Sequence, residues 1–161
     1  MGLGQQAGRE RGRGTLDGMD WAILTQLQAD ARLSFNELSR RVHLSAPAVA
    51  ERVRRLTETG VLRGYHAEID LDLAGWPVLA LVRMACYGPT CVLRDPDLAT
   101  WAGVLEIHRV TGDDCSILKV AAPSMAAFEA LIDALAAFGT PSSTLVLSSP
   151  LPRNDISRPP T

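Results

Sequence analysis

The sequence predicts an α+β protein with two parts, a helical N-terminal half and a C-terminal half built around a β-sheet. Before residue 60, three short segments repeat apolar side chains every three or four positions, which is typical of helices around a common core. After Pro77 the apolar period changes to two. The 161 residues, 47% of them hydrophobic and 21% charged, suffice for two small domains of ordinary globular composition.

The first two predicted helices each begin at a capping residue. Asp17 precedes the first apolar stripe, and its carboxylate can accept hydrogen bonds from the free N–H groups of the first turn. Ser34 and Glu37 fit the S-x-x-E capping box, in which each side chain satisfies the backbone of the other residue. We therefore expect a second, short helix that ends near His43.

A third helix follows the two-residue link 43–44. Ser45 is the expected cap, and Pro47 falls in the first turn, where its missing N–H leaves no hydrogen bond unmade. Gly60 marks the end of this helix. The apolar residues of 61–69 flank Arg63 and Gly64, a pattern that predicts a small hairpin. The first half is thus predicted to be a winged helix-turn-helix.

The second half alternates strands and helices in the order β-α-β-β-α-β, which is the ferredoxin-like pattern. The expected strands are residues 77–87, 104–111, 116–121 and 144–149, and the expected helices are 95–102 and a segment from Ser124 to Gly139. Both faces of 77–87 are apolar. We therefore expect the domain's own helices to cover one face and a second copy of the chain to cover the other.

These patterns divide the chain into five segments. They are a flexible tail (1–15), a helix-turn-helix domain (16–70), a linker (71–76), a ferredoxin-like domain (77–149) and a second loose tail (150–161). The first tail is rich in Gly and Arg, and the second contains four prolines. Neither tail has enough apolar surface to order itself.

Several classes of protein are disfavoured. No apolar run reaches the roughly 18–20 residues that cross a bilayer, and no secretory signal is present, so a cytoplasmic protein without membrane contact is expected. Cys86, Cys91 and Cys115 are too few for a disulfide framework, and we expect reduced thiols. A zinc site that includes His108 is the minor alternative to the prediction that the chain binds no metal.

The helix after Ser45 is the predicted DNA-reading element. Between residues 40 and 63 the chain has six Arg and two acids, a local positive excess that suits a phosphate backbone. Small side chains at the start of the helix can enter a major groove. The expected double-stranded DNA contacts are Arg40, Arg41, Ser45, Ala46, Pro47, Ala50, Glu51, Arg52, Arg54 and Arg55. Alternatively the arginines are a solvated face, and Glu51 either accepts from a cytosine amino group or repels phosphate.

Several segments of the chain, taken in order, resemble one protein family. Segments 16–24, 30–32, 37–39, 44–45, 52–56 and 60–65 closely resemble the N-terminal domain of Lrp/AsnC-type bacterial transcription regulators, and 104–113 is similar to the entry of that family's effector loop. The resemblance implies a DNA-binding homodimer and an amino acid effector bound between subunits. In that family dimers often assemble into octamers, and the sequence leaves dimer and octamer as alternatives. The dimer would form through the sheet of the second half.

The effector residues implied by the resemblance are Gly112, Asp113, Asp114, Ser143 and Thr144. Gly112 and Asp113 match the first two positions of the family's Gly-Asp-Tyr-Asp loop, whereas Asp114 and Cys115 replace its last two. Chemically, a carboxylate can receive an ammonium group. The alternative is a plain turn, which Gly and Asp also favour.

Two other functions compete with regulation. A siroheme-decarboxylase-like enzyme resembles the same two-domain arrangement and would use His66, His108, Arg83 and Arg109. A ligand-independent architectural DNA-binding protein would differ only in lacking an effector response. Since no catalytic motif, phosphate loop or paired-Cys metal motif is present, we expect neither catalytic residues nor a cofactor.

Overall fold

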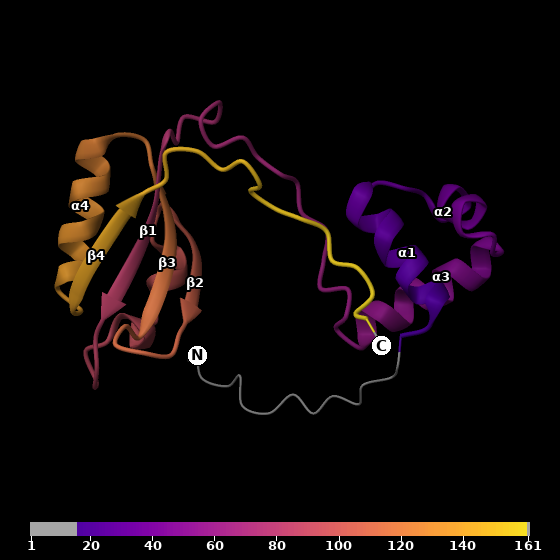
Figure 1. Ribbon diagram of the computed structural model, residues 1–161, viewed down its shortest axis with the longest axis horizontal. Coiled ribbons are helices and arrows are strands. Elements are labelled where there is room, and N and C mark those ends of the chain that lie inside the picture. Colours follow the sequence, from indigo (N-terminus) through magenta and orange to yellow (C-terminus); the bar gives the residue numbers. More distant parts are fainter. Residues whose placement is uncertain (1–15, 161) are drawn as a thin grey trace. The chain divides into compact units, whose positions relative to one another are not determined.

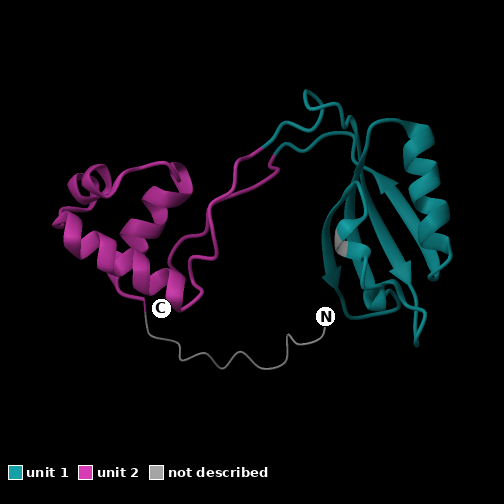
Figure 2. Cartoon of the chain, turned by 180° about the vertical axis from the view of Figure 1, so that it is seen from behind, with its two compact units in different colours: residues 1–6, 69–150 teal, residues 7–68, 151–161 magenta. Residues whose placement is uncertain are grey.

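The computed structural model describes residues 16–160, which form a helical unit (16–68 with 151–160) and a sheet unit (69–150) (Figures 1 and 2). The predicted first tail, with Arg9, Arg11 and Arg13, lies outside the described residues. No helix in the described part of the chain is long and apolar enough to cross a membrane. The α+β class with its helix-turn-helix and ferredoxin-like parts is confirmed.

The three predicted helices of the first half are present. They are α1 (Gly18–Ala29), α2 (Phe35–Val42) and α3 (Ala46–Glu58). Asp17 and Ser34 cap α1 and α2 in complete capping boxes, with Asp20 and Glu37 as the respective third residues. Ser45 caps α3, where its hydroxyl accepts from the backbone N–H of Ala48 at 3.4 Å.

One apolar core joins these helices. Its buried members are Ile23, Leu24, Leu27, Leu38, Val42, Val49, Val53 and Leu56. Burying one such side chain stabilises a fold by roughly 1.5–3 kcal/mol. This core fixes which side of α3 faces outward, because the stripe of Val49, Val53 and Leu56 faces the other two helices.

The predicted wing is wrong. Residues 61–70 contain no strand, and Val61, Tyr65 and Ile69 are exposed. A two-stranded hairpin needs further strands or a packed face to be stable, and these residues find neither within the helical unit. Gly60 ends α3 with a φ of 74°, and the N–H of Leu62 then donates to the carbonyl of Leu56 at 2.9 Å.

The C-terminal segment is held at one point. It has no regular secondary structure, but the amide of Gln28 donates to the carbonyl of Ile156 at 3.0 Å and accepts from its N–H at 2.9 Å. These bonds join α1 to a segment for which the composition predicts only a loose tail.

The sheet unit has four antiparallel strands in the order β2-β3-β1-β4, as the ferredoxin-like pattern requires. Its elements are β1 (Val78–Ala85), β2 (Val104–Arg109), β3 (Ser116–Ala122), α4 (Met125–Ala136) and β4 (Thr140–Leu145). On one face, Ala80, Val82 and Met84 of β1 are fully buried in a core shared with α4. On the opposite face Leu81 is 42% exposed, and no element of this unit packs over it.

Two elements of this unit differ from the prediction. The expected helix 95–102 is replaced by a single turn, η2 (Leu98–Thr100), and a second single turn, η1 (Val92–Arg94), precedes it. Pro96 and the Asp95 carboxylate, which accepts from the N–H of Asp97, favour tight turns between them. The last strand was expected at 144–149 but begins at Thr140. The polar residues and Pro141 of β4 do not show the apolar pattern of a strand. They are tolerated because β4 is an edge strand.

Candidate functional site

The α2–α3 pair has the geometry of a helix-turn-helix. His43 ends α2 in the left-handed conformation, with φ 55° and ψ 41°, which reverses the chain within the two-residue link. The outward side of α3 then presents exposed Pro47, Glu51 and Arg54, with half-buried Ala46 and Ala50 beside them. A helix whose first turns are this small can approach the floor of a major groove.

Arg52 and Arg55 are held by α1 rather than directed only toward solvent. Arg52 donates through Nη1 to Asp17 at 2.7 Å and to Asp20 at 2.8 Å, and Arg55 donates through Nη2 to both oxygens of Asp20 at 2.7 and 2.8 Å. Asp20 is only 1% exposed. These two arginines therefore tie the reading helix to the start of α1.

These ion pairs shift the pKa values of the residues that form them. Hydrogen bonds from the Asp20 backbone N–H and then from the Arg52 side chain lower the pKa of Asp17. The carboxylates of Asp17 and Asp20 in turn raise the pKa of Arg52. On the outward side, Arg54 donates to Glu51 at 2.6 and 3.1 Å and to Glu58 at 2.6 Å. Hydrogen bonding by Arg54 lowers the pKa of Glu51, and both glutamates raise the pKa of Arg54.

Arg40 and Arg41 end α2 on the surface. Arg41 donates to the side-chain oxygen of Gln26 at 3.2 Å, and neither arginine forms an ion pair within residues 16–160. Their charge lies near Glu37, whose pKa is lowered first by the Ser34 hydroxyl and backbone and then by these two guanidinium groups. Both arginines are exposed and available to an external anion.

The predicted effector loop joins β2 to β3. Gly112 has a φ of 112°, and an added Cβ there would meet no atom within 4 Å. The carbonyl of Asp113 accepts from the Tyr87 hydroxyl at 2.6 Å, and Asp114 lies 3.8 Å from the Nε of Arg83. The loop is therefore anchored to β1 and to the segment that follows it.

The β4 residues of the predicted site are divided between two faces. Thr144 pairs with Leu81 and Ser142 with Arg83, so these hydroxyls share the open face with Arg83 and Asp114. Ser143 pairs with Val82 and lines a cavity against α4. The sequence did not indicate that Ser142 lies beside Arg83, because the period of β4 cannot be assigned without the register.

The histidine–arginine set of the alternative enzyme is also divided. His108 and Arg83 lie on the open face, whereas Arg109 pairs with Ser116 and faces the other side. His108 contacts Glu106 at 3.0 Å and does not reach the cysteines. Hydrogen bonds from His108 and Lys119 lower the pKa of Glu106. His66 belongs to the other unit.

The two domains match the models of one family. Residues 16–57 match the AsnC-type helix-turn-helix domain, and residues 96–156 match the Lrp/AsnC ligand binding domain. The chain is 36% identical to the transcriptional regulator Rv2324 of Mycobacterium tuberculosis, over 86% of this chain and 96% of the relative. It is 34% identical to LrpC of Bacillus subtilis over 73% of this chain and 82% of LrpC.

Solved structures agree with this assignment. The structure of LrpC from Bacillus subtilis superposes with a TM-score of 0.80 at 30% identity and covers 86% of this chain and 99% of that one. The feast or famine regulatory protein of Mycobacterium tuberculosis, complexed with L-methionine, superposes with a TM-score of 0.77 at 29% identity, over 88% and 99% of the two chains. The chain belongs to the Lrp/AsnC family of transcriptional regulators.

Proposed function

We propose that this regulator binds operator DNA as a homodimer through α3 and that an amino acid modulates the binding. The observation that carries the proposal is the outward side of α3, where Ser45 caps the helix start, the small residues Ala46, Pro47 and Ala50 form the first turns, and Arg54 is exposed beyond them. The free N–H groups at a helix N-terminus favour phosphate, and Arg40 and Arg41 lie at the end of the preceding helix.

Within this proposal the arginines have different tasks. Arg40, Arg41 and Arg54 contact DNA, and Arg54 exchanges its glutamate partners for phosphate or a base edge. Arg52 and Arg55 instead hold α3 at the correct angle, because their guanidinium groups already bind Asp20. Ser45, Ala46, Pro47, Ala50 and Glu51 form the surface that enters the groove.

The open face of the sheet supports a dimer. Leu79, Leu81 and Ile117 lie on this face, and Leu81 is exposed. Two copies related by a two-fold axis would cover these side chains and present paired reading helices to successive major grooves. Leu81→Asp is expected to convert the dimer to a monomer in analytical ultracentrifugation, whereas an unchanged mass would exclude this face.

The effector site is proposed on the same open face. Asp114 can bind the ammonium group of an amino acid, while Arg83 binds its carboxylate and Ser142 and Thr144 supply hydroxyls. Gly112 lets the backbone approach the ligand. The L-methionine complex of the Mycobacterium tuberculosis relative supports an amino acid as the ligand class.

The decisive experiment is genomic footprinting of the purified protein with and without a panel of amino acids, followed by anisotropy titrations on the recovered operator. A ligand-independent architectural protein would bind DNA with no amino acid response. A tight, stoichiometric Soret shift with siroheme and no DNA affinity would instead support the enzyme.

Variants then test the contacts. Arg40→Ala with Arg41→Ala should flatten the plot of log affinity against log salt by about 1.8 per protomer, since each lost phosphate contact removes roughly 0.9. Arg94→Ala in the sheet unit is the control for a lost positive charge. An unchanged slope in the double variant would remove both arginines from the interface.

A further inference from the structure

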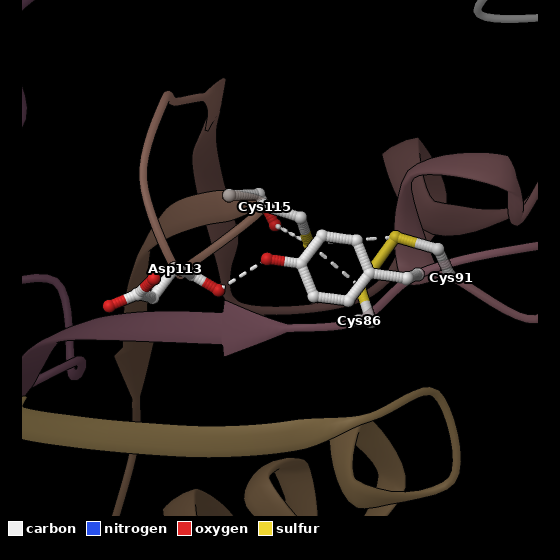
Figure 3. The surroundings of a disulfide bond; sticks show 6 residues. Cys86, Cys91, Asp113 and Cys115 are labelled. Atoms are coloured by element: carbon white, nitrogen blue, oxygen red, sulfur yellow. Dashed lines mark hydrogen bonds between the residues drawn. A yellow bond between two sulfur atoms is a disulfide. The ribbon is translucent and has the colours of Figure 1, made fainter.

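The three cysteines of the chain meet in the sheet unit. Cys86 and Cys91 form a disulfide, and the Sγ of Cys115 lies 2.8 Å from that of Cys86 and 3.5 Å from that of Cys91 (Figure 3). The expectation of three reduced thiols is therefore wrong for this structure. Sequence spacing alone could not predict that the three cysteines lie together, because Cys115 is 24 residues from Cys91.

Backbone geometry fixes this cluster. Cys86 follows β1, and a turn over 88–91 returns the chain so that the Cα atoms of Cys86 and Cys91 are 4.9 Å apart. Cys115 precedes β3, and its N–H donates to the carbonyl of Met84 at 2.8 Å. Cys86 and Cys91 are buried and Cys115 is half-buried. The end of β1, the turn at 88–91 and the start of β3 therefore bring the three sulfur atoms together.

We propose that the reduced form of this cluster binds one thiophilic metal ion through Cys86, Cys91 and Cys115. All three sulfur atoms lie within 4.8 Å of one another, so one ion can contact them all after small rotamer adjustments. Thiolates are the ligands that Zn²⁺ and Cu(I) prefer among protein side chains. The site goes beyond the regulatory function and does not depend on DNA or amino acid binding.

The chemistry balances in two steps. A low-molecular-mass thiol reduces the Cys86–Cys91 disulfide, giving two cysteine thiols and the disulfide of the reductant. The metal ion then binds three thiolates and releases three protons. In the oxidised form two of the three sulfur atoms are bonded to each other, so the same site is closed to metal.

The surroundings suit a charged metal–thiolate centre. The cluster lines a cavity of about 520 Å³ whose lining also includes Arg94, Arg109 and Asp95. Three thiolates around a divalent ion carry one net negative charge, and two guanidinium groups against one carboxylate leave the rest of the lining with a net positive charge that favours it. The cavity leaves room for a fourth ligand such as water, the arrangement of an open zinc site.

Metal titration of the full chain tests this site. Anaerobically reduced protein is titrated with Co²⁺, and we expect one equivalent to produce a sulfur-to-cobalt charge-transfer band together with tetrahedral ligand-field bands. Competition with Zn²⁺, and separately with Cu(I), identifies which ion the site prefers. Cys115→Ser should weaken binding by about 100-fold or more, since even removal of an outer-shell partner costs 10–100-fold.

Two controls make the test decisive. His108→Ala should bind Co²⁺ like the parent, whereas a loss of binding would assign the metal to a histidine site and overturn the proposal. Protein oxidised to the Cys86–Cys91 disulfide should show no charge-transfer band. Equal binding by oxidised protein, or by Cys115→Ser with an unchanged circular dichroism spectrum, would also overturn it, as would the absence of binding by reduced protein.

Discussion

Replacing Asp20 by Asn tests whether a buried carboxylate positions the reading helix. Asp20 is 1% exposed and accepts from Arg52 at 2.8 Å, from Arg55 at 2.7 and 2.8 Å, and from the Asp17 N–H at 3.1 Å. Asparagine keeps the shape and one acceptor oxygen but removes the charge. Any loss of stability then reports the charge-assisted bonds.

The magnitude follows from exposure. Breaking a fully buried ion pair costs about 3–5 kcal/mol, and a hydrogen bond to a charged group contributes about 1.5–3 kcal/mol. Here the side chains of Arg52 and Arg55 are 26% and 52% exposed, so water can solvate both once the carboxylate is gone. We therefore expect Asp20→Asn to lower the free energy of unfolding of the helical unit by about 2 kcal/mol.

Urea unfolding followed by far-ultraviolet circular dichroism and by tryptophan fluorescence measures this change. With a slope of roughly 1–3 kcal/mol per molar urea, the midpoint of the helical unit should fall by about 1 M. Glu58→Gln, which removes an exposed partner of Arg54, is the matched control and should leave the midpoint unchanged. If the two variants unfold alike, the carboxylate of Asp20 does not hold α3.

Four further outcomes are expected. Glu51→Gln should raise affinity for random DNA if Glu51 only repels phosphate, but should lower discrimination at one base pair if it accepts from cytosine, as operator and random-DNA titrations will show. His43→Gly should raise the urea midpoint slightly, because His43 is left-handed; a lower midpoint would contradict this. Asp114→Asn should abolish the amino acid effect on DNA affinity, and an unchanged response would place the effector elsewhere. Hydrogen bonds lower the pKa values of Asp17 and Glu37 below those of free carboxyl groups. Their contribution to stability is therefore complete above the unfolded pKa values and is lost as pH falls through the lowered folded values, and unfolding free energies that are flat from pH 6 to about 2 would refute this.

Local patterns predicted the helical unit well because its signals are local. The caps at Asp17, Ser34 and Ser45 depend on residues three positions apart, and the structure has each helix start where the sequence placed it. The sheet was harder to predict. The last strand is an edge that tolerates Ser, Thr and Pro, so neither hydrophobic alternation nor β-propensity marked its beginning at Thr140.

The sequence pointed to the arginines of α3 but could not show which groups they contact. Contacts across 32–35 residues joined Arg52 and Arg55 to Asp20, and no spacing rule reports such a pairing. One local signal was available. Asp20 lies on the same helical stripe as Ile23, Leu24 and Leu27, and an acid on a buried stripe requires a cationic partner.

The pairing of Asp20 changes how the positive excess of this segment should be interpreted. Of the six arginines between residues 40 and 63, Arg52, Arg54 and Arg55 form ion pairs with acids of α1 or α3 within the described chain. Surface charge that an external phosphate can recruit without breaking an ion pair is therefore concentrated at Arg40, Arg41 and Arg63. A helix whose own outward charges are mutually satisfied gains little from non-specific phosphate attraction. In the proposed complex, shape and base contacts at the small N-terminal end of α3 are therefore expected to supply the discrimination, and Arg40 and Arg41 the general affinity.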